Sequence, residues 1–132
     1  MSIDPRLDLH THSTFSDGKD SLADNVRAAE RCGLHTLGAA DHVRRDTPWL
    51  PAYVAELRHL RRTTDIRLVI GVEAKILDEA GRLDLPEDHR GVERVLIADH
   101  QLPLGLRCYR PKEIRQALAS GDFDGDGHLD LA

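Results

Sequence analysis

The chain has 132 residues, which is enough for one domain. Its formal net charge of −5 at pH 7 disfavours a dedicated DNA- or RNA-binding module. The longest clean apolar run, residues 68–72, is far too short to cross a bilayer. The N-terminus lacks the pattern of a secretory signal, so we expect a cytoplasmic protein with no membrane partner. The chain has eight histidines, several of them beside acidic residues. This feature of the composition indicates a site with chemical activity, because divalent metals bind imidazole together with carboxylate.

Hydropathy patterns predict alternating strands and helices along the chain. Residues 7–12 alternate as a strand that places Asp8, His10 and His12 on one face. A capping-box pattern at Ser21 and a glycine at position 33 bound the first predicted helix. The remaining expected elements are a strand at 36–40, a helix from 51 to about 60, a strand at 68–72, an excursion or hairpin at 74–85, a strand at 92–98 and a helix at 111–121.

Ionisable residues follow each predicted strand. Parallel βα units bring the carboxyl ends of all their strands to one edge of the sheet, so these residues should converge. Each one alone has a structural explanation, such as a hydrogen-bonded histidine or a helix-capping aspartate. Together they predict a metal site with more than one ion, in which a metal-bound hydroxide attacks a phosphate ester. The converging positions are His10 and His12, Asp41 and His42, Glu73, and Asp99 and His100.

Four ordered motifs resemble those of the polymerase and histidinol phosphatase (PHP) superfamily. They lie at residues 8–18, 40–42, 71–73 and 98–100. The resemblance implies an α/β fold of parallel βα units, the N-terminal portion of a distorted (β/α)7 barrel, with residues 1–119 as an incomplete PHP-like domain. It also implies up to three Zn, Mn or Fe ions.

Position by position, the resemblance assigns roles to residues of the motifs. Glu73 would bridge two ions, and together with Asp41 it is predicted to be catalytic. Asp41 and Asp8 also resemble positions that support the ligands. The metal ligands that the resemblance implies are His10 and His12 for one ion, Asp17 and His42 for a second, His100 for a third, and the bridging Glu73.

The function implied by the resemblance is hydrolysis of a small phosphomonoester. A metal-dependent exonuclease is one alternative, and a non-catalytic metal-binding or structural fragment is another. The net negative charge favours the small phosphorylated substrate over a nucleic acid. The sequence does not reach the late histidine and Asp-x-His motifs of the family, so we expect little or no phosphatase turnover from these 132 residues alone.

Three further features leave their interpretation open. Arg44 and Arg45 could receive a substrate phosphate, although a solvated loop is the favoured interpretation. Within residues 120–132 the acids have calcium-loop spacing and also resemble the calcium-binding turn of FG-GAP repeats. The equal alternative is an acidic, disordered terminus that would cap the next helix in a longer chain. The candidate calcium ligands are Asp122, Asp124, Asp126 and Asp130.

Overall fold

The computed structural model describes residues 3–78 and 80–98. The predicted helix at 111–121, the domain boundary at 119 and the tail at 120–132 lie outside these residues. The described elements alternate as expected: β1 (Leu7–Thr11), α1 (Leu22–Arg31), β2 (Thr36–Val43), α2 (Leu50–Leu60), β3 (Arg67–Lys75) and β4 (Arg94–Ala98).

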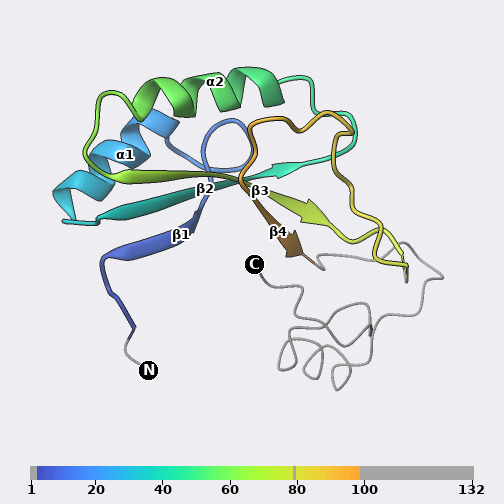
Figure 1. Ribbon diagram of the computed structural model, residues 1–132, viewed down its shortest axis with the longest axis horizontal. Coiled ribbons are helices and arrows are strands. Elements are labelled where there is room, and N and C mark those ends of the chain that lie inside the picture. The colour runs from blue at the N-terminus through green and yellow to red at the C-terminus, as the bar shows by residue number, and fades with distance from the viewer. Residues whose placement is uncertain (1–2, 79, 99–132) are drawn as a thin grey trace.

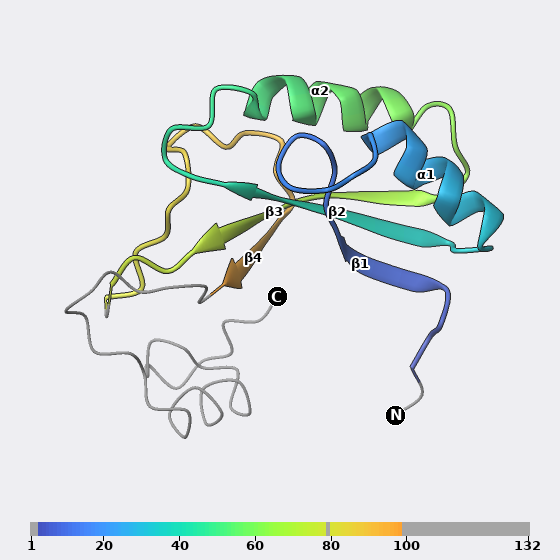
Figure 2. The same cartoon turned by 180° about the vertical axis from the view of Figure 1, so that it is seen from behind.

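The four strands form one parallel sheet in the order β1-β2-β3-β4. The sheet curls like part of a barrel wall, with both helices on one face (Figure 1), and the view from behind shows the same arrangement (Figure 2). The expected parallel βα units, as in the N-terminal portion of a (β/α)7 barrel, are therefore confirmed. We call the sheet face opposite the helices the inner face.

Local sequence signals bound α1 as predicted. The Ser21 hydroxyl accepts a hydrogen bond from the Asp24 backbone N–H at 3.1 Å, which satisfies one free donor at the helix N-terminus. Gly33 follows the helix with φ of +71°, a conformation that glycine adopts without a steric penalty. The face of α1 that packs against the sheet carries Leu22, Val26 and Ala29.

The core lies between α2 and the helix-facing side of β2 and β3. Pro51 lies in the first turn of α2, where its missing N–H costs nothing. None of the helices in the described ranges is long and apolar enough to cross a membrane. The residues that fill the core include Leu50, Tyr53, Val54 and Leu57 from α2 and Ile70, Val72 and Ala74 from β3.

The predicted ends of two strands are wrong. We expected strands at 36–40 and 68–72, whereas β2 continues to Val43 and β3 to Lys75. Ladder pairing extends both strands, because His42 pairs with Glu73 and Lys75 pairs with Ala98 of β4. The ionisable residues therefore lie within the strands, where alternation decides which face each side chain takes.

The expected alternation of β1 is also wrong. The pairing with β2 shifts between Asp8 and Thr11, so these two residues pair with Leu37 and Ala39, which share one face of β2. Asp8 consequently does not join the two histidines. Its carboxylate instead accepts the backbone N–H of His10 at 3.1 Å. An irregularity of this kind depends on pairing with the neighbouring strand, so the hydropathy pattern of β1 alone does not predict it.

Of the two expected forms of the segment after β3, an excursion or a hairpin, the described residues show a hairpin. Ile76 and Leu83 form an antiparallel bridge, and the Leu77 N–H donates to the Arg82 carbonyl at 2.7 Å. The Gly81 N–H donates to the Asp78 carbonyl at 3.1 Å and closes the turn. The hairpin thus leaves the sheet at the carboxyl end of β3 and returns toward β4.

Arg61 and Glu93 tie the end of α2 to the sheet. The Arg61 guanidinium donates to the Leu68 carbonyl and to the Glu93 carboxylate, and that carboxylate accepts the Ile70 N–H at 3.0 Å. The hydrogen bond from Arg61, followed by the one from Ile70, lowers the pKa of Glu93 below its ordinary value. A carboxylate with a lowered folded-state pKa stabilises the fold above its unfolded-state pKa, and this contribution disappears as the pH falls through the lowered value.

We expect Glu93→Gln to reduce the free energy of unfolding by about 0.5–1 kcal/mol at pH 7, because the pair is partly exposed. The difference from wild type should shrink between about pH 5 and pH 3 as the Glu93 carboxylate takes up a proton. Urea unfolding at several pH values measures both effects. Glu87→Gln, at an exposed loop position, is the control, and an equal loss in that variant at pH 7 would contradict the assignment to Glu93.

Candidate metal centre

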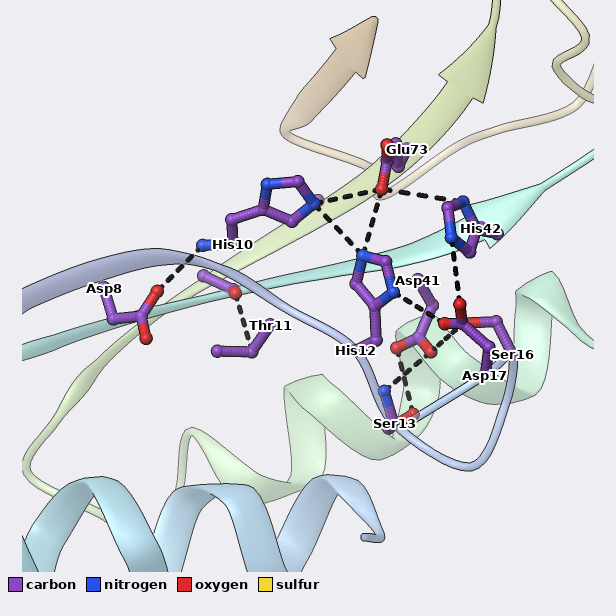
Figure 3. A network of polar contacts seen from close by, with 12 residues as sticks. Asp8, His10, Thr11, His12, Ser13, Ser16, Asp17, Asp41, His42 and Glu73 are labelled. Carbon is purple, nitrogen blue, oxygen red and sulfur yellow. Dashed lines mark hydrogen bonds and ion pairs between the residues drawn. The ribbon is translucent and has the colours of Figure 1, made fainter. Parts of the chain in front are cut away.

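One oxygen of Glu73 is the centre of the site. Its Oε2 lies 3.0 Å from His10 Nε2, 3.0 Å from His12 Nε2 and 3.5 Å from His42 Nδ1 (Figure 3). The Glu73 side chain is only 5% exposed. A nearly buried carboxylate that meets three imidazoles is the arrangement expected of a ligand to more than one cation.

Asp17 forms the second part of the cluster. Its Oδ1 lies 2.6 Å from His12 Nδ1, and its Oδ2 lies 3.3 Å from His42 Nε2. His12 and His42 thus lie between two carboxylates (Figure 3). The Glu73 side chain on one side is nearly buried, and the Asp17 side chain on the other is 63% exposed. The hydrogen bond from His12 lowers the pKa of Asp17, so Asp17 is a carboxylate at neutral pH.

Small residues on β2 allow the cluster to form across three strands. His42 of β2 pairs directly with Glu73 of β3, whereas the β1 histidines must reach past β2. Gly38 and Ala40 share the face of β2 that carries His42. A Cβ at Gly38 would lie 2.7 Å from the Leu9 Cα, so this glycine permits the close approach of β1.

Asp41 anchors the loop that carries Asp17. Its fully buried carboxylate accepts the Ser13 N–H at 2.8 Å, the Ser13 hydroxyl at 2.9 Å and the Ser16 hydroxyl at 2.6 Å. Asp41 and His42 are consecutive strand residues, so they face opposite sides of the sheet. Asp41 is therefore turned toward the loop and the helices while His42 is turned toward Glu73 (Figure 3).

Two further contacts hold the same loop. Phe15 packs against Trp49 and Tyr53, with ring centroids 5.3 and 5.4 Å apart. The Tyr53 hydroxyl donates to the Gly71 carbonyl at 2.7 Å, and burial and then the charge of Asp41 raise its pKa, so it stays protonated. The loop between β1 and α1 is thus fixed to the core on the helix side.

Gly18 closes the loop against the end of β1. A Cβ on this residue would lie 2.4 Å from the His12 carbonyl carbon, which is closer than real side chains approach. Its N–H donates to the Ser13 carbonyl at 2.9 Å. The Asn25 side chain donates to the His12 carbonyl at 2.9 Å and holds the same turn from α1. Only a residue without a side chain fits position 18 in this conformation.

The donor set suits divalent transition metals. Two overlapping groups have ligand atoms within 4.8 Å of one another. Imidazole nitrogens combined with carboxylate oxygens are the ligands that Zn, Mn and Fe accept. The residues present therefore fit the implied ions. The first group is His10, His12 and Glu73, and the second is His12, Asp17 and His42.

Five of the six predicted metal ligands come together in the structure, and the other predicted site residues fall into two classes. Asp8 and Asp41 lie within the described residues but outside the cluster, and the catalytic role of Asp41 stays a prediction. His100 and the four candidate calcium ligands of the tail lie outside the described residues. Arg44 and Arg45 are exposed, in agreement with the solvated loop. The converging ligands are His10, His12, Asp17, His42 and Glu73.

Sequence reasoning singled out Asp41 but missed its partners in the loop and the aromatic residue behind it. Ser13 and Ser16 are the first and last residues of the segment that joins His12 to Asp17. Tyr53 lies on the buried side of α2. A serine in a loop and an aromatic residue in a helix are both common without a role at a site. Only the contact of the two serines with the buried Asp41 reveals that they hold the loop in place.

Comparison with known proteins agrees with this geometry. The chain matches the PHP domain family over residues 8–132. The chain belongs to the PHP domain family. This PHP chain is 33% identical over 114 residues to a probable phosphatase of Caldanaerobacter subterraneus subsp. tengcongensis, with 81% of the chain and 42% of that protein covered.

Two further relatives also match the chain over only part of their own length. A probable phosphatase of Thermoanaerobacter sp. is 36% identical over 116 residues, covering 81% of the chain and 43% of that protein. A probable phosphatase of Vibrio parahaemolyticus is 28% identical over 132 residues, covering 94% and 52%. The PHP chain therefore spans about half the length of the curated relatives it matches.

Proposed function

We propose that this PHP chain is the N-terminal part of a metal-dependent phosphoesterase that hydrolyses a small phosphomonoester. The observation that carries the proposal is the convergence of three imidazoles on Oε2 of Glu73. Relatives named as probable phosphatases support the phosphoester class. The net charge of −5 supports a small substrate rather than a nucleic acid.

Zn, Mn or Fe are the ions we propose, with one ion at each of the two described ligand groups and a third at His100. Bound divalent ions would polarise the phosphoryl oxygens and lower the pKa of a water molecule at the site. Glu73 and Asp17 supply the negative charge that such cations need. Burial fixes Glu73 in position, and Asp41 fixes the loop that positions Asp17.

The exposure of the ligands indicates the side from which a substrate enters. The Glu73 side chain is almost closed to solvent, whereas that of His10 is 54% exposed. The Asp17 side chain is also open to solvent. A phosphate group would therefore approach from the carboxyl edge of the sheet, between His10 and Asp17, with Glu73 at the base of the site.

The test measures hydrolysis by the complete gene product that carries this chain. We expect turnover of p-nitrophenyl phosphate that depends on added Mn²⁺ or Zn²⁺ and falls at least about 100-fold in His12→Ala, because a ligand shared by both groups is lost. His59→Ala, at an exposed position of α2, is the matched control and should retain activity.

The substrate panel separates the alternatives. Bis(p-nitrophenyl) phosphate and single-stranded DNA are assayed beside the monoester under the same metal conditions. Faster hydrolysis of the DNA than of the monoester would favour an exonuclease. Tight metal binding without hydrolysis of any of the three would favour a non-catalytic protein and would contradict the proposal.

A further inference from the structure

Lys75 is a cationic residue on the same side of the sheet as the metal ligands. It is the last residue of β3 and lies two positions beyond Glu73. Side chains alternate along a strand, so Lys75 and Glu73 share the inner face, separated by about 6.6 Å along the strand. Lys75 lies on the carboxyl side of Glu73, which is the side from which a phosphate group would approach.

The backbone of Lys75 is held on both sides. Its carbonyl accepts the Asp84 N–H at 2.8 Å from the returning arm of the hairpin. On the other side Lys75 pairs with Ala98 of β4, and the next residue, Ile76, donates its N–H to the Ala98 carbonyl at 3.1 Å. The base of the side chain is therefore fixed, while its four-carbon stem lets the ammonium group move.

The ammonium group of Lys75 has unused donor capacity in the described part of the chain. The side chain is half-buried and makes no hydrogen bond or ion pair with residues 3–78 or 80–98. The nearby acids have other partners. Asp78 binds Arg82, and Asp84 accepts the Arg45 N–H at 2.7 Å. A half-buried cation that has no acidic partner among the described residues, beside the proposed phosphate site, is suited to an anionic ligand.

We infer that Lys75 binds the substrate phosphate and sets the preference for monoesters over diesters, a role that rests on the proposed function. A phosphomonoester has three non-bridging oxygens, and a diester has two. Cations held by the ligand cluster would contact two of the phosphate oxygens, and Lys75 would contact a further oxygen at the rim of the site. Because the diester lacks that third oxygen, Lys75 favours the monoester through a charge-assisted hydrogen bond. Lys75 is a substrate-binding residue and moves no proton in this assignment.

Lys75→Met in the complete gene product removes the charge and retains most of the stem. We expect KM for p-nitrophenyl phosphate to rise about 10–100-fold and the dissociation constant of inorganic phosphate, measured by calorimetry on the Mn²⁺-loaded protein, to rise by a similar factor. KM for bis(p-nitrophenyl) phosphate should change less than about threefold, and Mn²⁺ affinity should not change. Lys75→Arg should restore most of the phosphate affinity.

Arg67→Met is the matched control, because Arg67 begins the same strand on the same face at the far end from the site. It should leave both phosphate measurements unchanged. Phosphate affinity within twofold of wild type in Lys75→Met, or a wild-type protein that binds no phosphate, would overturn the inference. A loss of Mn²⁺ affinity in that variant would show a structural role instead.

The inference and the proposed function fail in different ways. A wild-type protein that binds phosphate but hydrolyses no ester would contradict the phosphatase, and the phosphate dissociation constants would still decide the role of Lys75. Hydrolysis of monoesters with equal KM in wild type and Lys75→Met would support the phosphatase and overturn the role of Lys75.

Discussion

Glu73→Gln is expected to weaken the binding of the first Mn²⁺ or Zn²⁺ ion at least about 100-fold and to abolish the second binding step. The reason is that one oxygen of Glu73 lies within 3.5 Å of all three imidazoles of the cluster, so its charge acts on every histidine ligand of the described site. The amide that replaces it has no charge and is a poor bridge between cations. Titration calorimetry of the metal-free gene product measures both steps.

Glu87→Gln makes the same chemical change at an exposed loop position and should leave metal binding intact. Circular dichroism of the metal-free proteins verifies that Glu73→Gln folds, since loss of a buried charge among imidazoles should not unfold the sheet. Two binding steps of wild-type affinity in Glu73→Gln would rule out Glu73 as the bridging ligand.

Asp41→Ala is expected to lower the free energy of unfolding by about 3 kcal/mol, because three donors from Ser13 and Ser16 lose a buried acceptor. Metal affinity should fall about 10–100-fold as well, since the loop that places Asp17 beside His12 and His42 loses its anchor. Urea unfolding and metal titration measure the two losses.

Two variants test the specificity of this effect. Asp41→Asn keeps the size of the side chain and one accepting oxygen, so its losses should be smaller than those of Asp41→Ala. Asp46→Ala, on the exposed loop after β2, should change neither quantity. Loss of stability in Asp41→Ala with unchanged metal affinity would show that the buried hydrogen bonds do not position Asp17.

Most of the secondary structure could be predicted from local signals. Ser21 and Gly33 bound α1 as expected, because capping and left-handed glycine conformations depend on the residue at that position and its immediate neighbours. The convergence of His10, His42 and Glu73 was also predictable. Parallel strands joined by helices must bring their carboxyl ends to one edge of the sheet, whatever the details of packing.

The tertiary structure decided which way the site residues face. The alternation expected for β1 fails because its pairing with β2 shifts between Asp8 and Thr11. Asp41 adjoins His42 in the sequence, but the extended ladder places the two on opposite faces, so Asp41 binds the loop and His42 joins the cluster.

By itself the sequence determined the order of the elements and the edge at which His10, His12, His42 and Glu73 gather, because these depend on residue type and short-range periodicity, whereas Asp17 was assigned through the resemblance to the PHP family. The assembled sheet decided which residues Asp41 contacts. It also decided that β3 continues to Lys75, which places Lys75 on the same face as Glu73. Strand length and register come from pairing with neighbours far away in the sequence, and a shift of one residue in register moves the side chains of a strand to the opposite face of the sheet.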